Sequence, residues 1–96
     1  MEHPYIELDT AQKEAIYLGY ALPLTKSEYE VFKVIFECEA YADANQICMK
    51  ASDKLSLSPS CIAVHVFSIN RKAVRLGGKK IVGYKKKYGY FVKEIV

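Results

Sequence analysis

The 96-residue sequence lacks long apolar stretches. No run of about 18 apolar residues is present, so a membrane-spanning helix is not expected. The N-terminal segment MEHPYIELDT carries acidic residues and no apolar core of a secretion signal, which favours a reducing compartment, the cytoplasm. A chain of this length can build one modest hydrophobic core, so we expect a single domain over residues 1–96 without membrane contact.

Cysteine is scarce and lacks metal-binding spacing. Cys38, Cys48 and Cys61 are odd in number and form no C-x-x-C motif, which argues against a disulfide framework and against a zinc site. We expect three free thiols, at least two of them buried. His65 lies four residues after Cys61, but no third or fourth ligand accompanies the pair. Neither a metal nor a cofactor is therefore expected.

Acidic residues are nearly absent from the second half of the chain, where Glu94 is the only acid after Asp53. This half has no carboxylate pair, and the chain has no nucleophile beside a base and no glycine-rich phosphate loop, so an enzyme is not expected. The charges are polarised: residues 1–45 hold 3 Lys and 9 Asp/Glu, a net charge of −6, whereas residues 71–96 hold 9 Lys/Arg and one Glu, a net charge of +8. Such polarity is expected for nucleic-acid binding, although ordinary proteins also show it.

The hydrophobic pattern of the first half predicts strands and then helices. YIELD alternates apolar and acidic residues, and EAIYLGYALPL is rich in β-branched and aromatic residues, so a small antiparallel sheet is expected over residues 5–24. A capping-box pattern, in which a side-chain acceptor is followed three residues later by Glu or Gln, then occurs twice. Thr25 with Glu28 predicts a helix over residues 25–39, and Asp43 with Gln46 predicts one over residues 43–54.

Residues 59–76 are predicted to form the third helix. Ser58 can cap it, Pro59 suits its first position, and Gly77-Gly78 can end it. At 100° per residue, one stripe of the helix faces the core and comprises Ile62, Val66, Ile69, Ala73 and Leu76. The opposite side carries Ser68, Arg71, Lys72 and Arg75 together with Cys61 and Val64, while His65 lies at the border.

The C-terminal residues 79–95 are expected to form a hairpin around the turn in GYKKKYGYF. Its tyrosines, Tyr84, Tyr88 and Tyr90, are expected to pack across the strands rather than to stack on bases. A lysine run by itself indicates either a solvated loop or a polyanion contact. The predicted fold class is thus α+β, with a small N-terminal antiparallel sheet, three helices and a C-terminal hairpin.

Three short motifs occur in order along the chain. Their residues are Leu24, Thr25 and Glu28, then Ile62, Val64, His65 and Val66, then Gly89 and Tyr90. They resemble the OmpR/PhoB-type winged-helix effector domain of bacterial response regulators, whose first helix opens with Leu-Thr followed by Glu, whose recognition helix carries Val-x-Val-His-Ile, and whose wing ends in Gly-Tyr. The resemblance covers residues 5–92 and implies a winged helix-turn-helix that binds double-stranded DNA to regulate transcription in a two-component system.

The resemblance also implies where DNA would be contacted. The third helix would enter the major groove, and the lysine turn, as the wing, would reach the adjacent backbone or minor groove. The implied contacts are Cys61, Val64, His65, Ser68, Asn70, Arg71, Lys72, Arg75, Lys85, Lys86 and Lys87. The loop at residues 52–58 and an exposed phenylalanine would be candidates for contact with RNA polymerase or another protein, through Asp53, Lys54, Ser56, Ser58 and Phe67.

The helix departs from the family pattern on its groove-facing turns. Where the family places several Arg or Lys, this chain has Cys61, Ala63, Phe67, Ser68 and Asn70. Specificity would then come from Ser68, His65, Asn70, contact with thymine methyl groups, or DNA shape, and a weak sequence preference is predicted. Phe67 can either pack under the sheet or remain exposed for a partner. The alternative function is a winged-helix module that binds protein and has weak or no affinity for DNA.

The family places a receiver domain before the effector domain, and 96 residues leave no room for one. The chain is then either a stand-alone effector or a part of a longer regulator. Family members commonly occupy direct repeats about one helical turn apart, which makes a weak dimer on such sites an expectation of the resemblance that no residue here proves.

Overall fold

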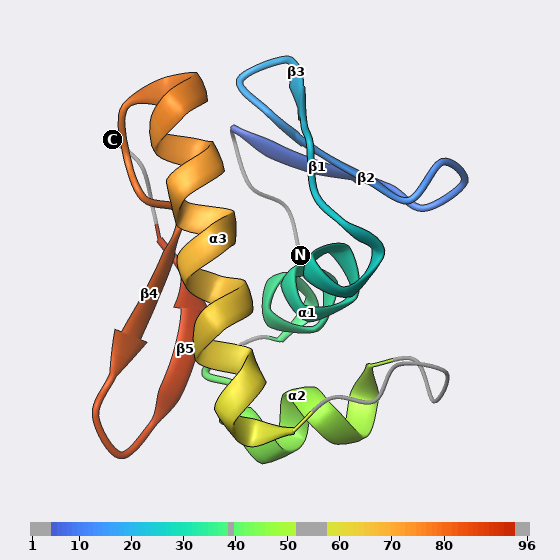
Figure 1. Ribbon diagram of the computed structural model, residues 1–96. Helices are drawn as coiled ribbons and strands as arrows, with labels where there is room; N and C mark the ends of the chain where they lie inside the picture. The colour runs from blue at the N-terminus through green and yellow to red at the C-terminus, as the bar shows by residue number, and fades with distance from the viewer. Residues whose placement is uncertain (1–4, 39, 52–57, 94–96) are drawn as a thin grey trace.

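The computed structural model describes residues 5–38, 40–51 and 58–93, and shows a three-stranded antiparallel sheet, three helices and a two-stranded hairpin. The predicted α+β fold class is confirmed. In Figure 1, α3 crosses the molecule at full length, with the N-terminal sheet beside one end and the turn of the hairpin directed toward the other. The elements are β1 (Ile6–Asp9), β2 (Glu14–Tyr17), β3 (Tyr20–Leu22), α1 (Lys26–Glu37), α2 (Ala44–Lys50), α3 (Pro59–Gly77), β4 (Val82–Lys85) and β5 (Gly89–Val92).

The N-terminal sheet closes one side of the core. Ile6 pairs with Tyr17 across β1 and β2, and Ala15 pairs with Leu22 across β2 and β3. Because alternate residues of a strand face the same side, all four of these side chains are buried. The two-residue turn between β2 and β3 has positive φ at both of its central residues, as a hairpin turn that follows the strand twist requires.

Both predicted capping boxes are present. Thr25 Oγ1 accepts a hydrogen bond from Glu28 N at 3.2 Å, and Glu28 Oε1 accepts one from Thr25 N at 3.0 Å. The Asp43–Gln46 pair makes the same two bonds at the start of α2. Both helices end earlier than predicted, α1 at Glu37 and α2 at Lys50, because the next residue of each is extended; residues 39 and 52–57 lie outside the described part.

The three cysteines are free, as predicted, but none of them is buried. The expectation of at least two buried thiols was wrong. Cys38 is the C-cap of α1, and together with Cys48 it lies at the edge of the core. Cys61 is in the first turn of α3. Positions at helix ends and core edges leave each thiol partly accessible.

Four of the five predicted core residues of α3 are buried, namely Ile62, Val66, Ile69 and Ala73. Leu76 is 37% exposed, so its prediction as a core residue was wrong. The last turn meets the N-terminal sheet through Gly77, where an added Cβ would lie 2.7 Å from Tyr17 Cε2 and 2.8 Å from Leu18 Cδ1. Gly78, at φ +81°, then ends the helix. Ser58 occupies the N-cap position but makes no capping bond with its side chain, which also departs from the prediction.

The hairpin is tied to the segment between α1 and α2. Ala42 N donates to Tyr90 O at 3.0 Å, and Tyr90 N donates to Ala42 O at 2.8 Å. Gly89, at φ +124°, allows this approach, because a Cβ there would lie 2.6 Å from Ala42 O. The strands are shorter than the predicted span and begin only at Val82, while residues 94–96 lie outside the described part.

The tyrosines of the hairpin pack in two ways. Tyr84 and Tyr90 are partners across the strands with ring centroids 4.9 Å apart, as predicted for cross-strand packing. Tyr88 instead lies 5.3 Å from the ring of Tyr41, which precedes α2. None of the described helices is long and apolar enough to cross a membrane.

Candidate nucleic-acid interface

Asn70 of α3 is bonded to the start of β4. Its Oδ1 accepts hydrogen bonds from Ile81 N at 3.0 Å and Val82 N at 2.9 Å, and its Nδ2 donates to Val82 O at 2.9 Å. Two donors saturate Oδ1, so the bidentate pairing by which an asparagine reads adenine is not available. Asn70 therefore joins the helix to the hairpin, and its contact with DNA stays a prediction.

Lys72 and Ser68 both act on Glu28 of α1. Glu28 is only 6% exposed and forms a salt bridge with Lys72 Nζ, and the Ser68 hydroxyl lies near the same carboxylate and lowers its pKa. Burial raises the pKa of Glu28, but the bonds from Lys72, Ser68 and the Thr25 amide outweigh it, and the net pKa is lowered. The carboxylate is therefore ionised at neutral pH. Lys72 and Ser68 join α3 to α1 at this carboxylate, and their contact with DNA stays a prediction.

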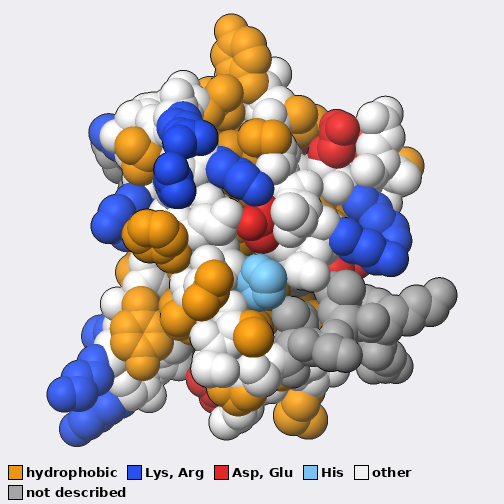
Figure 2. Space-filling model, in the orientation of Figure 1, with side chains coloured by type: hydrophobic (Ala, Val, Ile, Leu, Met, Phe, Trp, Pro, Cys, Tyr) orange, Lys and Arg blue, Asp and Glu red, His pale blue; other side chains and the backbone are white. Residues whose placement is uncertain are grey.

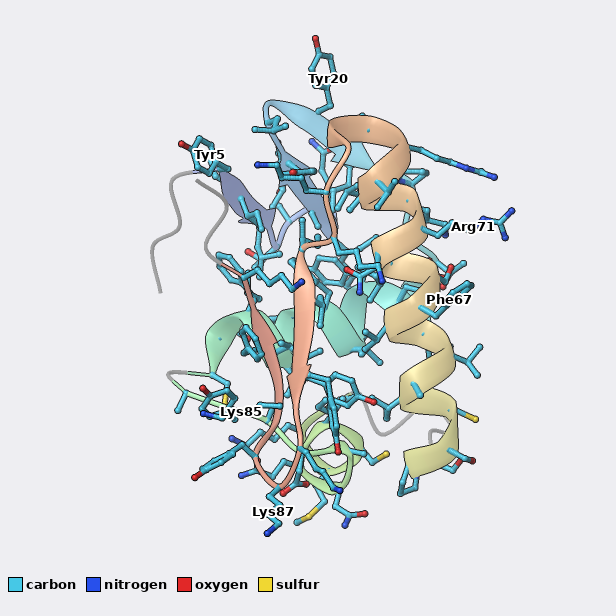
Figure 3. All side chains as sticks on the ribbon, turned by 90° about the vertical axis from the view of Figure 1, so that its left-hand side faces the viewer. Tyr5, Tyr20, Phe67, Arg71, Lys85 and Lys87 are labelled. Carbon is cyan, nitrogen blue, oxygen red and sulfur yellow. The ribbon has the colours of Figure 1, made fainter. Side chains whose placement is uncertain are left out.

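We call Ser68, Asn70 and Lys72 the anchoring set, because all three bond other elements of the fold. A second set, the outer strip, comprises Phe67, Arg71, Val74 and Arg75, which follow one another at helical spacing and are exposed. In Figure 3, Phe67 and Arg71 project from the side of α3 that faces away from the hairpin strands. Of the cationic residues of the helix that were predicted to contact DNA, Arg71 and Arg75 are thus exposed.

Phe67 is 69% exposed, so the alternative in which it packs under the sheet was wrong. It borders an open hollow of about 380 Å³. The lining combines apolar and cationic side chains: Phe67, Asn70, Arg71, Val74, Arg75 and Lys80. The sequence did not predict Lys80 here, because the chain reversal at Gly78 that brings it beside the last turns of α3 has no helical period of its own.

The first turns of α3 present Cys61, Val64 and His65. Val64 is 66% exposed, whereas Cys61 and His65 are half-buried. The Ser58 hydroxyl donates a hydrogen bond to Cys61 Sγ at 3.2 Å and lowers the pKa of that thiol. Within the described ranges, no group of three or more His, Cys, Asp or Glu side chains could hold a metal ion.

The three wing lysines are all exposed but differ in their contacts. The turn closes with Tyr88 N donating to Lys85 O at 3.0 Å, and Lys87 has φ +75°. Lys85 Nζ lies 4.8 Å from the centroid of Tyr88 and 5.9 Å from that of Tyr41, which is cation–π geometry. In the described part of the chain, Lys86 and Lys87 make no comparable contact. Tyr41, distant in sequence, was not predicted here.

Figure 2 shows how the cations are placed on this face. Lysine and arginine side chains gather near one end of α3 and at the tip of the hairpin, with hydrophobic side chains between them. Of the predicted partner contacts, Asp53, Lys54 and Ser56 lie outside the described residues. Ser58 is half-buried beside Cys61, and Phe67 belongs to the outer strip.

Solved structures with the same fold include DNA-binding domains of response regulators. The AdeR DNA-binding domain, solved with an intercistronic region, is 16% identical, with a TM-score of 0.80 over 99% of this chain and 100% of that one. The CpxR DNA-binding domain from E. coli is 19% identical, with a TM-score of 0.66 over 96% of this chain and 93% of that one.

A third similar structure is a member of a family of redox sensors in the streptococci that evolved from two-component response regulators. It is 15% identical, with a TM-score of 0.79 over 99% of this chain but only 44% of that one, so this chain spans less than half of that protein. No protein-family model and no curated protein matches the sequence. The chain has the winged-helix fold of OmpR/PhoB-type effector domains, and these neighbours are regulators rather than enzymes.

Proposed function

We propose that this protein binds double-stranded DNA and regulates transcription in the cytoplasm. In this proposal α3 enters the major groove and the lysine turn lies on the adjacent backbone or in the minor groove. The observation that carries it is the charge of this face. Exposed cations follow α3 and the hairpin, while no Asp or Glu occurs between residues 58 and 93. Solved neighbours of the same fold that are DNA-binding domains support the proposal.

The dimensions and charges of the two elements suit a duplex. An α-helix with side chains is about 10–12 Å across, and the major groove is about 12 Å wide. Arg71 and Arg75 would lie against the phosphates that border the groove, and Lys86 and Lys87 would extend to a neighbouring stretch of backbone. Each phosphate that is neutralised releases condensed counterions, so affinity should fall steeply with salt.

The acidic half of the chain would orient the protein. Glu7, Asp9 and Glu14 lie on the N-terminal sheet, which Figure 1 places beside α1 and away from the tip of the hairpin. Phosphates repel these carboxylates, which disfavours approach through the sheet. The duplex would therefore meet α3 and the wing.

The second candidate function is protein binding with weak or no affinity for DNA. Its support is that the anchoring set removes three polar side chains from base reading, while Phe67 and Tyr20 remain 69% and 67% exposed. RNA polymerase and a second copy of the chain on direct repeats are partners that the first proposal would also accept.

Fluorescence anisotropy of a labelled random-sequence duplex tests the first proposal. With four or five phosphate contacts, log K should fall with log salt at a slope of about −4. The variant Lys86→Ala/Lys87→Ala should bind more weakly with a flatter slope. The charge-matched control Lys13→Ala/Lys26→Ala, on the opposite half of the chain, should leave the slope unchanged. Binding that depends neither on salt nor on the wing lysines would refute the mechanism.

A further inference from the structure

We propose that Phe67 is a specificity-determining residue that reads thymine, by packing its exposed ring against C5-methyl groups in the major groove. Val74 extends the apolar contact, and Arg71 and Arg75 hold the bordering phosphates. The inference rests on the proposed function and adds to it the chemistry by which a base is recognised.

The first observation is the exposure of Phe67. Its ring is 69% exposed on the middle of α3, the element that would enter the groove, and Val74 is 42% exposed two turns further along. Exposed apolar side chains occur singly on most proteins, but here two of them border one hollow of about 380 Å³. The hollow is open to solvent, so a partner can reach the ring without rearrangement of the fold.

The second observation is that hydrogen-bonding readout is largely removed from the same turns of the helix. Asn70 Oδ1 already accepts two backbone N–H groups, and Ser68 and Lys72 are bonded to Glu28. In the major groove the thymine methyl group is the feature that an apolar side chain can recognise. A ring at the centre of the outer strip is therefore suited to thymine and contributes no hydrogen bond that would favour another base.

The third observation favours DNA as the occupant of the hollow. Arg71, Arg75 and Lys80 line it beside Phe67. An apolar centre bordered by cations matches a groove floor of methyl groups bordered by phosphates. A protein segment is the competing occupant, and the test below separates the two.

The experiment begins with selection of preferred sites from a pool of random duplexes, using the wild-type chain. Each thymine of the selected site is then replaced in turn by uracil, which lacks only the C5-methyl group. Burial of one methyl group corresponds to about a fourfold change in affinity, so one or two replacements should each weaken binding about fourfold. The Phe67→Ala variant should bind the thymine site more weakly than wild type and should no longer distinguish thymine from uracil at those positions.

Tyr20→Ala supplies the matched control, because Tyr20 is 67% exposed but lies on the N-terminal sheet at the opposite end from the wing lysines (Figure 3). This variant should keep the full uracil effect. Salt-dependent binding in which no uracil replacement matters, or in which Phe67→Ala keeps the discrimination, would overturn the inference and leave the proposed function intact. A complete lack of duplex binding at low salt would overturn both, and loss of a protein complex on Phe67→Ala with DNA affinity unchanged would assign the hollow to a protein.

Discussion

The anchoring set and the outer strip lie on the same helix and are interleaved in sequence. The residues of the first set bond other elements of the fold, whereas those of the second are exposed. Lys72 is bonded to a buried carboxylate, whereas Arg71, its neighbour in the chain, is exposed. Asn70 binds three backbone groups of the hairpin segment, whereas Phe67, one turn earlier, is exposed beside an open hollow. Polar character alone therefore does not separate the side chains of this helix that bond other elements from those that are free for a ligand; the partners of each side chain do.

The two sets contribute differently to the fold. The polar side chains of the anchoring set position α3 relative to α1 and the hairpin, so they fix the distance between the two elements that would meet DNA. The outer strip contributes little to the fold and is available for a ligand. Substitutions in the first set should act on stability, and those in the second on affinity.

The largest expected effect is that of Asn70→Ala. The substitution removes three hydrogen bonds and leaves backbone groups of Ile81 and Val82 without their partner. We expect a loss of about 3 kcal/mol in the free energy of unfolding, measured by urea denaturation. Asn45→Ala on the exposed side of α2 is the control and should cost well under 1 kcal/mol. A loss for Asn70→Ala no larger than that of the control would contradict the anchoring role.

Lys72→Met should have the next largest effect. It leaves the Glu28 carboxylate buried without its cation, and since the Lys72 side chain is 23% exposed we expect a loss of about 2 kcal/mol rather than the full cost of a buried pair. The double variant Glu28→Gln/Lys72→Met should recover part of this loss in a double-mutant cycle. Strictly additive losses would show that the two side chains do not interact.

A smaller effect is expected from pH. The pKa of Glu28 is lowered from its unfolded value of 4.5, because hydrogen bonds from Lys72 and Ser68 and the Thr25 amide outweigh burial. The unfolded state therefore binds the proton more readily, so the stabilisation is fully present above pH 4.5 and disappears as pH falls through the lowered folded pKa. The difference in unfolding free energy between wild type and Glu28→Gln, followed from pH 6 to about pH 3, should shrink. A constant difference would contradict the assignment.

The smallest expected effect is a difference between two wing lysines in how their substitution changes the salt dependence of DNA binding. Lys86→Ala should reduce the magnitude of the slope of log K against log salt by about 0.9, the value of one phosphate contact. Lys85→Ala should change the slope less, because Lys85 lies over Tyr88 and Tyr41, and should instead lower thermal stability slightly. Equal changes in the slope for Lys86→Ala and Lys85→Ala would show that the cation–π contact does not prevent Lys85 from contacting phosphate.

The sequence predicted the fold class because its signals are local. Each signal depends on residues that are close together in the chain. The signals are the two capping boxes, the apolar stripe of the third helix and the lysine turn between two strands. The anchoring set could not be predicted in this way. Ser68 and Lys72 lie on the helical wheel away from the core stripe, and their bonding to Glu28, 44 residues before Lys72, depends on how α1 packs against α3. The prediction that Leu76 is a core residue was wrong for a similar reason, because the end of the helix packs against the sheet through Gly77.

The most direct measurement is the salt dependence of duplex binding for two adjacent substitutions, Arg71→Ala and Lys72→Met, at a temperature where both variants are folded. Each substitution removes one positive charge from α3. If only the total charge of the helix mattered, both substitutions would change the slope by the same amount. We predict that Arg71→Ala reduces the magnitude of the slope by about 0.9 and weakens binding, while Lys72→Met keeps the wild-type slope. A flattened slope for Lys72→Met with none for Arg71→Ala would contradict the division of α3 into an anchoring set and an outer strip.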